Sequence, residues 1–380
     1  MQQADIAQLP KIVSDALFRA VGEWNSGDLS AAGATFGKLL AQRVVHPIVA
    51  YAAAGFMMAK GDMARAWALY ERRLNLSYYT HRPFAMLDRP YWDGAPMKDA
   101  RLLIFADMGL GDTILMARFL PWAENQVGGL ALQVNKGSAN FWRHRFPAVA
   151  VSELGDPLPD CDVKLNIFCL PRLYGASPDT LPRAPYLSPR DGLRAEWRGR
   201  LGEGFNVGIS WQGNPSHMRD NERSIPLGRF VRMAADPDLA AAGVNFYSLQ
   251  VGDGREELVR MSSAVDDRFT DLGADIMASD DPLGASAALA AELDLVIAVD
   301  STLANLCGAM GLNFWLPTYT QPEWRWCIYP SLDPAQPETA PWYGSQTPYP
   351  YHERWQVDAS VLDMHNDLRA RFGIPPFKVT

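Results

Sequence analysis

The stretch LDLVIAVDSTLANLCGAMG, residues 293–311, decides the fold class of this chain. Residues 293–299 form a short, mostly apolar run, which is typical of a strand buried on both faces. Asp300, Ser301 and Thr302 follow this run, and the residues after them, to about 310, have the composition and length of a helix. A buried strand that passes directly into a helix is the repeating unit of a parallel α/β sheet. Its polar turn lies at the carboxyl edge of the sheet, where such folds bind ligands.

The same alternation of strand and helix occurs in two series along the chain. The first series has strands predicted at 101–106, 130–134, 149–152 and 162–167, with a helix over 112–126. The second series has strands predicted at 206–211, 244–249, 293–299 and 313–316, with helices over 226–236, 254–262, 282–292 and 302–310. Between the series, residues 171–205 contain five prolines and read as a connection. We therefore expect an α/β protein with two Rossmann-like parallel sheets that face a cleft.

The N-terminal segment contains an internal repeat. Gly27-Asp28 recurs as Gly61-Asp62, an offset of 34 residues, and Phe36 recurs as Tyr70 at the same offset. This is the period of tetratricopeptide repeats, and it predicts helices near 10–25, 29–43, 46–60 and 63–76. Two repeats are fewer than the three or so that usually stand alone, so the segment should pack on the next domain or on a partner. The alternative is a helical cap with no binding role.

These patterns divide the chain into four predicted parts. The helical segment comes first, the two sheet domains follow, and a tail rich in Trp, Tyr and Pro, expected to pack back across the domains, comes last. The predicted boundaries are 1–88, 89–190, 191–335 and 336–380.

A glycine-rich turn follows the first predicted strand of the first sheet. Gly109 and Gly111 allow the backbone to turn tightly and approach a ligand, and Thr113 lies at the same turn. Asp112 lies between them at the start of a helix, at the mouth of the sheet. Its carboxylate could accept a proton from an attacking hydroxyl, or it could only cap the helix. The spacing is not G-x-G-x-x-G, so the turn does not predict a dinucleotide site.

Three further turns of the second sheet are candidates for ligand binding, because each follows a predicted strand. A guanidinium beside a helix N-terminus suits a pyrophosphate, and the polar end of the second strand could hydrogen-bond a base or a ribose. The Ser-Thr helix start favours an anion through its free N–H groups and the helix dipole. Each turn could instead be a solvated loop or a helix cap. The candidate residues are Trp211, Gln212, Gly213, Asn214, Arg223, Ser224, Gln250, Asp300, Ser301, Thr302, Leu303 and Asn305.

Composition argues against several functional classes. The net charge is −8 and no basic stripe is visible, so nucleic acid is not an expected partner. No basic region followed by an apolar run opens the chain and no apolar run of about 18 residues occurs, so we expect neither a signal peptide nor a membrane span. The four cysteines form no C-x-x-C pair, which predicts reduced, buried thiols and a cytoplasmic protein. The six histidines lack metal-ligand spacing, so no metal is expected.

Three pairs of segments together resemble one family. They are GLGDT with RFLP (109–113 and 118–121), VGISWQGNP with RSIPL (207–215 and 223–227), and the opening stretch with PEWRW (293–311 and 322–326). In this order they resemble the heptosyltransferase-like (family 9) glycosyltransferases that are fused to tetratricopeptide repeats. The resemblance runs from about residue 93 to residue 326.

The resemblance implies a GT-B fold, with the acceptor on the N-terminal half and a nucleotide-sugar donor on the C-terminal half. It implies that Asp112 matches the catalytic base and that the helix start at 300–303 holds the donor diphosphate. It implies transfer of a sugar to an acceptor hydroxyl with no bound metal or other cofactor, the acceptor being a surface glycan or a protein such as flagellin, held by the repeats. One alternative is a non-catalytic scaffold, which Asn305 favours because this family usually has His there. Another is an epimerase-like enzyme.

Overall fold

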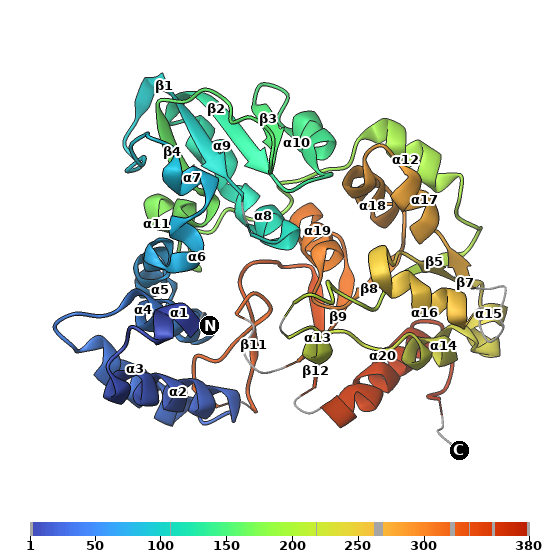
Figure 1. Ribbon diagram of the computed structural model, residues 1–380. Helices are drawn as coiled ribbons and strands as arrows, with labels where there is room; N and C mark the ends of the chain where they lie inside the picture. The colour runs from blue at the N-terminus through green and yellow to red at the C-terminus, as the bar shows by residue number, and fades with distance from the viewer. Residues whose placement is uncertain are drawn as a thin grey trace.

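Two parallel sheets and a helical N-terminal segment make up the computed structural model (Figure 1). It describes residues 3–106, 108–217, 219–261, 269–319, 324–333, 335–351 and 354–377. The expected α/β fold with two facing sheet domains is confirmed. No helix within these ranges has the length and apolar composition needed to cross a bilayer.

The N-terminal segment consists of helices joined by short turns. Gly27 and Gly61 have nearly the same left-handed backbone, with φ of 82° and 85°, and each is followed by an Asp that precedes a helix. The two turns therefore repeat in structure as they do in sequence, although the assignment to the tetratricopeptide class remains a prediction. The helices are α1 (Gln3–Ile6), α2 (Lys11–Asn25), α3 (Leu29–Leu40), α4 (Pro47–Ala59), α5 (Met63–Glu71), η1 (Arg72–Asn75), α6 (Ser77–Thr80) and α7 (Pro83–Met86). In this segment α2 packs on α3 as α4 packs on α5.

The first sheet has the strand order β3-β2-β1-β4, and every neighbouring pair is parallel. Its strands are β1 (Met97–Phe105), β2 (Val127–Val134), β3 (Ala150–Glu153) and β4 (Val163–Asn166). Its helices are α8 (Leu110–Met116), η2 (Ala117–Phe119), α9 (Leu120–Glu124), α10 (Ala139–Arg145), η3 (Ile167–Cys169) and α11 (Leu170–Tyr174).

The second sheet has the order β12-β9-β8-β5-β6-β7 and is also parallel throughout. Its strands are β5 (Phe205–Ser210), β6 (Val244–Ser248), β7 (Phe269–Asp271), β8 (Leu295–Ala298), β9 (Phe314–Tyr319) and β12 (Gln346–Tyr351). Its helices are α12 (Asp191–Arg198), α13 (Asp220–Arg223), α14 (Gly228–Ala234), α15 (Pro237–Ala241), η4 (Gly252–Gly254), α16 (Arg255–Arg260), α17 (Gly273–Ala278), α18 (Pro282–Ala290), α19 (Thr302–Met310), η5 (Arg354–Gln356) and α20 (Val357–Arg371). A separate two-stranded ribbon pairs β10 (Cys327–Ile328) with β11 (Glu338–Thr339).

The tail contributes to both halves of the molecule. Residues 346–351 add the edge strand β12 to the second sheet, and α20 packs against β12, β9 and α14. Trp342 instead contacts Trp67 of the helical segment and accepts a hydrogen bond from Arg118 of the first half. Trp355 of the tail is 75% exposed, so this side chain does not take part in the packing expected of the tail.

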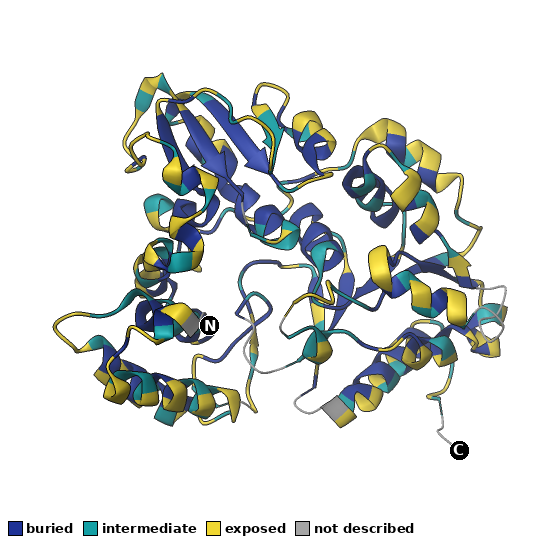
Figure 2. Cartoon of the chain, in the orientation of Figure 1, coloured by how far each residue is buried: buried dark blue, intermediate teal, exposed yellow. Residues whose placement is uncertain are grey.

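The central strands are buried on both faces (Figure 2), and successive residues of a strand pack into different clusters, as the two-residue period of a strand requires. On β8, Leu295 and Ile297 belong to the cluster beneath α14 and α20, whereas Val296 and Ala298 belong to the cluster that continues into the first half. The cluster that contains Val296 and Ala298 thus joins the two sheets, through the contact of α8 with α19. At this contact a side chain on Gly111 would lie 2.9 Å from the amide nitrogen of Asn305, so the approach requires glycine.

Candidate functional site

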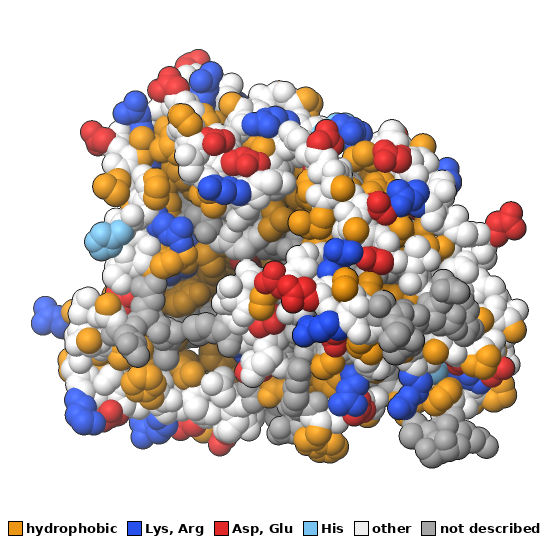
Figure 3. Space-filling model, turned by 45° about the vertical axis from the view of Figure 1, so that its right-hand side comes forward, with side chains coloured by type: hydrophobic (Ala, Val, Ile, Leu, Met, Phe, Trp, Pro, Cys, Tyr) orange, Lys and Arg blue, Asp and Glu red, His pale blue; other side chains and the backbone are white. Residues whose placement is uncertain are grey.

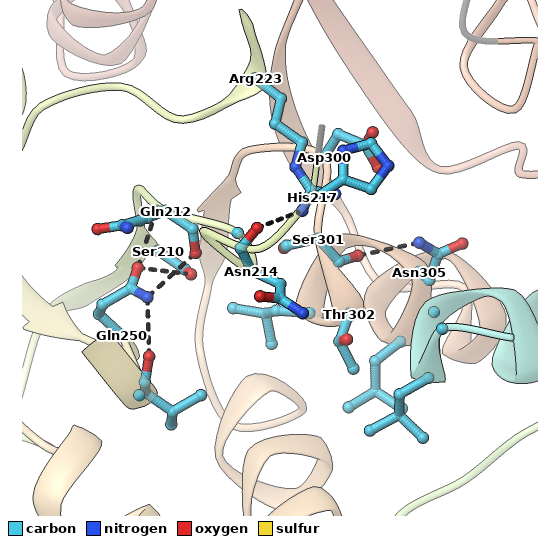
Figure 4. Close-up of a pocket in the computed structure, with 18 of the residues that line it drawn as sticks. Ser210, Gln212, Asn214, His217, Arg223, Gln250, Asp300, Ser301, Thr302 and Asn305 are labelled. Atoms are coloured by element: carbon cyan, nitrogen blue, oxygen red, sulfur yellow. Dashed lines mark hydrogen bonds between the residues drawn. The ribbon is translucent and has the colours of Figure 1, made fainter. Parts of the chain in front are cut away.

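A cleft of about 670 Å³ lies where the two halves meet. It is bounded by the turns at the carboxyl ends of β1, β5, β6 and β8, which is the edge where parallel sheets bind ligands. Most of the predicted site residues line it: Gly109, Gly111, Asp112, Gln212, Gly213, Asn214, Arg223, Gln250, Asp300, Ser301, Thr302, Leu303 and Asn305 (Figure 4). Residues more than 190 positions apart therefore meet in one space.

Asp112 is the carboxylate on the wall formed by the first half. It lies in the first turn of α8, and its Oδ2 accepts a hydrogen bond from the Gly109 N–H at 3.1 Å. Its Oδ1 accepts from Nη2 of Arg325 at 2.5 Å, and both side chains are 17% exposed. Asp112 thus closes the helix turn and also presents a carboxylate to the cleft, so the two alternatives from the sequence are not exclusive.

Polar side chains behind Asp112 hold its turn against the sheet. The Thr113 hydroxyl lies 3.3 Å from the Gly109 carbonyl oxygen and 3.0 Å from Oδ1 of Asn135, and its single proton is directed to one of these two acceptors. The amide of Asn135 donates to the Met108 carbonyl at 2.7 Å. Thr113 is buried and is not part of the cleft lining, so it supports the turn instead of contacting a ligand.

The opposite wall contains the start of α19. Ser301 is the N-cap residue of this nine-residue helix, and its hydroxyl accepts from the Ala304 N–H at 3.5 Å. The helix cap that the sequence allows at this turn is therefore Ser301, and Asp300 precedes it. Asp300, Ser301, Thr302 and Leu303 all line the cleft, so the first turn of α19 opens onto it. Unpaired N–H groups and the helix dipole make such a turn favourable for an anion.

The loop after β5 brings a guanidinium to the same wall. Arg223 donates from Nη2 to the Asn214 carbonyl at 3.3 Å and pairs through Nε with Asp220 at 3.1 Å. A Cβ on Gly213 would lie 2.7 Å from the guanidinium carbon, so Arg223 rests directly on the glycine backbone. The loop thus fixes one positive charge beside the cleft, 17% exposed.

Gln250 holds this loop in place. Its Oε1 accepts from the Ser210 hydroxyl and from the N–H groups of Trp211 and Gln212, at 3.2, 3.0 and 2.9 Å. Its Nε2 donates to the Gln212 carbonyl at 3.0 Å. The buried amide thus supports the loop, while Gln250 also lines the cleft, and its contact to a base or ribose stays a prediction.

Three further features of the loop after β5 and the helix that follows it do not contact the cleft as the sequence predicted. Trp211 is fully buried among core side chains and does not line the cleft. Ser224 is outside the lining and binds within the loop, accepting from Gly213 N–H and donating to Asp220. The helix expected from residue 226 begins at 228, and the Leu227 N–H is taken by Glu257 at 3.0 Å, so this helix start offers no phosphate site.

Asn305 lies behind the start of α19. Its amide nitrogen donates to the Ser301 carbonyl at 2.9 Å, and its oxygen accepts from the Tyr343 hydroxyl at 3.0 Å. Because Gly111 is packed against the same amide, Asn305 joins α19, α8 and the tail at the floor of the cleft.

Sequence reasoning gave no role to several residues of the lining. They include His217, Asp253, Ser286 and Arg325. Arg325 belongs to the PEWRW motif, of which Pro322 and Glu323 lie outside the described residues. His217, Asp253 and Ser286 lie in polar turns or on a helix face, and only the folded chain distinguishes them from other such residues.

Among the described residues, the cysteines and the surface charges outside the cleft suggest no second site. All four cysteines are free and buried, as expected, and burial raises the pKa of Cys169 and Cys307 to about 12, so both thiols stay protonated. On the face shown in Figure 3, Lys and Arg are interspersed with Asp and Glu. Within the described ranges, no three His, Cys, Asp or Glu are grouped to hold a metal ion.

Sequence comparison finds a curated relative of the chain. No family model matches the chain. Protein FlbA of Caulobacter vibrioides is 27% identical over 301 residues, which cover 70% of this chain and 47% of FlbA. The chain thus spans about half the length of this curated relative.

Comparison with solved structures finds glycosyltransferases. The family 9 glycosyl transferase from Veillonella parvula is 12% identical, with a TM-score of 0.50, over 73% of this chain and 99% of that one. The ADP-heptose lps heptosyltransferase II of E. coli is also 12% identical, with a TM-score of 0.49, over 72% and 99%. The chain therefore has the two-domain α/β fold of the Veillonella parvula glycosyl transferase, preceded by a helical segment.

Proposed function

We propose that the chain is a glycosyltransferase that moves a sugar from a nucleotide-sugar donor to an acceptor hydroxyl. The observation that carries the proposal is the arrangement of the cleft, in which Asp112 on one wall faces the open first turn of α19 on the other. A volume of about 670 Å³ suits a ligand of nucleotide-sugar size, since small-molecule sites measure roughly 300–1,000 Å³. The fold shared with a family 9 glycosyl transferase supports this choice.

The donor binds on the wall of the second half. Its diphosphate is held by the N–H groups at Ser301–Leu303 and by the guanidinium of Arg223, because both favour a multiply charged anion. The nucleoside lies along the apolar part of the same wall, near Leu249 and Leu283. The sugar then extends toward the first half.

The acceptor hydroxyl enters from the wall of the first half. Its oxygen attacks the anomeric carbon, and the bond from that carbon to the phosphate oxygen breaks. Asp112 takes the hydroxyl proton, and the nucleoside diphosphate leaves with the electron pair toward α19 and Arg223. The net result moves one negative charge from Asp112 to a leaving group that faces a helix N-terminus and a cation.

The acceptor is expected to be a protein or a surface glycan, presented beside the helical segment. We expect the transfer to need no bound metal, because fixed N–H groups and Arg223 neutralise the leaving group. Assays with and without a chelator test this expectation directly.

Binding of nucleoside diphosphates tests the proposed function first. UDP, GDP and ADP are added in thermal unfolding experiments, with the corresponding nucleosides as controls. At least one diphosphate should stabilise the folded protein, by about 2.7 kcal/mol at a concentration of 100 Kd, and its nucleoside should do less. The same mixture of UDP-, GDP- and ADP-linked sugars should release nucleoside diphosphate slowly, with water as acceptor. Stabilisation by none of these compounds, together with no release, would instead favour a non-catalytic scaffold.

A further inference from the structure

Residues 324–343, here called the strap, connect the cleft to the helical segment; residue 334 lies outside the described ranges. Between β9 and β12 of the second sheet, the chain runs toward the N-terminal helices, as Figure 1 shows for the stretch around β11. The Tyr329 N–H donates to the Ala59 carbonyl at the end of α4, at 2.6 Å. The strap is therefore anchored on the helical segment by the backbone.

Three buried tryptophans strengthen this anchor. Trp67 of α5 packs edge-on against Trp324 and Trp342 of the strap, with ring centroids 5.9 Å apart in both pairs. Trp324 and Trp342 are 5.4 Å apart. Arg118 of the first half donates to the Trp342 carbonyl at 2.9 Å. Because aromatic pairs of this kind hold a defined geometry, the position of Trp324 is set by the helical segment.

Arg325 extends from this anchored strap to Asp112. Its guanidinium lies over the ring of Trp324, 4.5 Å from the centroid, and donates to Oδ1 of Asp112 at 2.5 Å. The other oxygen of Asp112 is held by the Gly109 N–H. The carboxylate is thus fixed from both sides, and one of the two donors comes from the strap.

We propose that Arg325 is a positioning residue that aims the Asp112 carboxylate into the cleft, and that the helical segment sets this aim through the strap. The inference rests on the proposed function, because it needs Asp112 to be the base. The guanidinium stacked on Trp324 has little freedom, so it fixes the carboxylate more rigidly than a mobile cation could. The helical segment then determines the geometry of the active site through the strap, and this role does not depend on the identity of the acceptor.

Replacement of Arg325 by Met tests the proposal in the full-length protein. The reaction measured is release of nucleoside diphosphate from the mixed UDP-, GDP- and ADP-linked sugars, with water as acceptor. We expect kcat to fall by roughly 10²-fold, because a reacting group displaced by about 1 Å loses that much, while KM for the donor stays near the wild-type value. Arg325→Lys should recover part of the loss because it restores a cation.

A double-variant cycle separates positioning from a structural effect. In the Asp112→Asn background, Arg325→Met should lower the rate no further, since a residue that acts through Asp112 has nothing left to position. The matched control is Arg200→Met, because Arg200 also pairs with an aspartate at 2.5 Å and lies over a tryptophan, but outside the cleft. It should keep the wild-type rate.

Other results would overturn the inference in distinguishable ways. Full kcat in Arg325→Met with low activity in Asp112→Asn would remove Arg325 and leave the proposed function standing. Losses that multiply in the double variant would assign Arg325 an independent structural role. Full activity in both single variants would remove Asp112 as the base and, with it, the positioning role of Arg325, whereas no release of nucleoside diphosphate by the wild-type protein would reject the proposed function itself. If Arg325→Met does not fold, Arg325→Gln and Arg325→Lys replace it, and equal activities in these two would reject the inference.

Discussion

Asp112→Asn should lower the turnover of the nucleotide sugar by about 10²–10⁴-fold, the range that general base catalysis contributes. The amide has nearly the same shape as the carboxylate but cannot accept the hydroxyl proton. Binding of the nucleoside diphosphate should be unchanged, because the start of α19 and Arg223 lie on the other wall of the cleft. Steady-state release of nucleoside diphosphate gives kcat, and calorimetric titration gives Kd.

The control for this prediction is Asp275→Asn. Asp275 also pairs with an arginine, but it belongs to α17 and does not line the cleft. It should leave kcat and Kd at their wild-type values. Wild-type turnover by Asp112→Asn would remove Asp112 from the reaction, whereas loss of diphosphate binding would place Asp112 on the donor side.

Among the proposed variants, Trp67→Ala should lower the free energy of unfolding the most. Trp67 is 2% exposed and packs edge-on against Tyr70, Trp324 and Trp342. Truncation of a buried tryptophan leaves a cavity and costs about 3–5 kcal/mol. The folded fraction should also turn over donor more slowly, because the strap that carries Arg325 loses its anchor. Denaturant unfolding measures the free energy of unfolding, and kcat per folded molecule measures the second effect.

The exposed tryptophan Trp355 provides a matched control. Trp355→Ala removes the same atoms from a side chain that is 75% exposed, so unfolding and turnover should stay close to wild type. If Trp67→Ala were no less stable than Trp355→Ala, the tryptophan cluster could not be the anchor described above. A destabilised protein with unchanged kcat would confine the role of the cluster to folding.

Much of the fold follows from local patterns in the sequence. The apolar run 293–299 and its Asp-Ser-Thr turn predict β8 and α19 because burial, strand length and helix start agree locally. A general rule, that the turns after parallel strands gather at one edge of their sheet, places this turn and the turn at 109–113 each at the ligand-binding edge of its own sheet. Their meeting depends on the packing of α8 against α19, which joins the two sheets.

The edge strand β12 could not be predicted in this way. Its sequence QTPYPY contains Pro348 and Pro350, which argue against a strand because proline cannot donate to a ladder. The structure places it at the edge of the second sheet, paired on one side only with β9, where such prolines are tolerated.

The roles of Gln250 and Arg325 also depend on tertiary contacts. Gln250 lies at a strand end, where a polar side chain could face a ligand or the neighbouring loop, and only packing decides between them. Arg325 meets Asp112 across 213 positions of chain, through an anchor on a different domain. No local period or spacing encodes such a contact.

A crystal structure with 2-fluoro analogues of UDP-, GDP- and ADP-linked sugars would show where the donor binds and which way its anomeric carbon points. We expect the diphosphate to lie against the N–H groups at Ser301–Leu303, with the anomeric carbon turned toward Asp112 on the facing wall. A nucleotide bound on any other surface, or an anomeric carbon that points away from Asp112, would contradict this expectation.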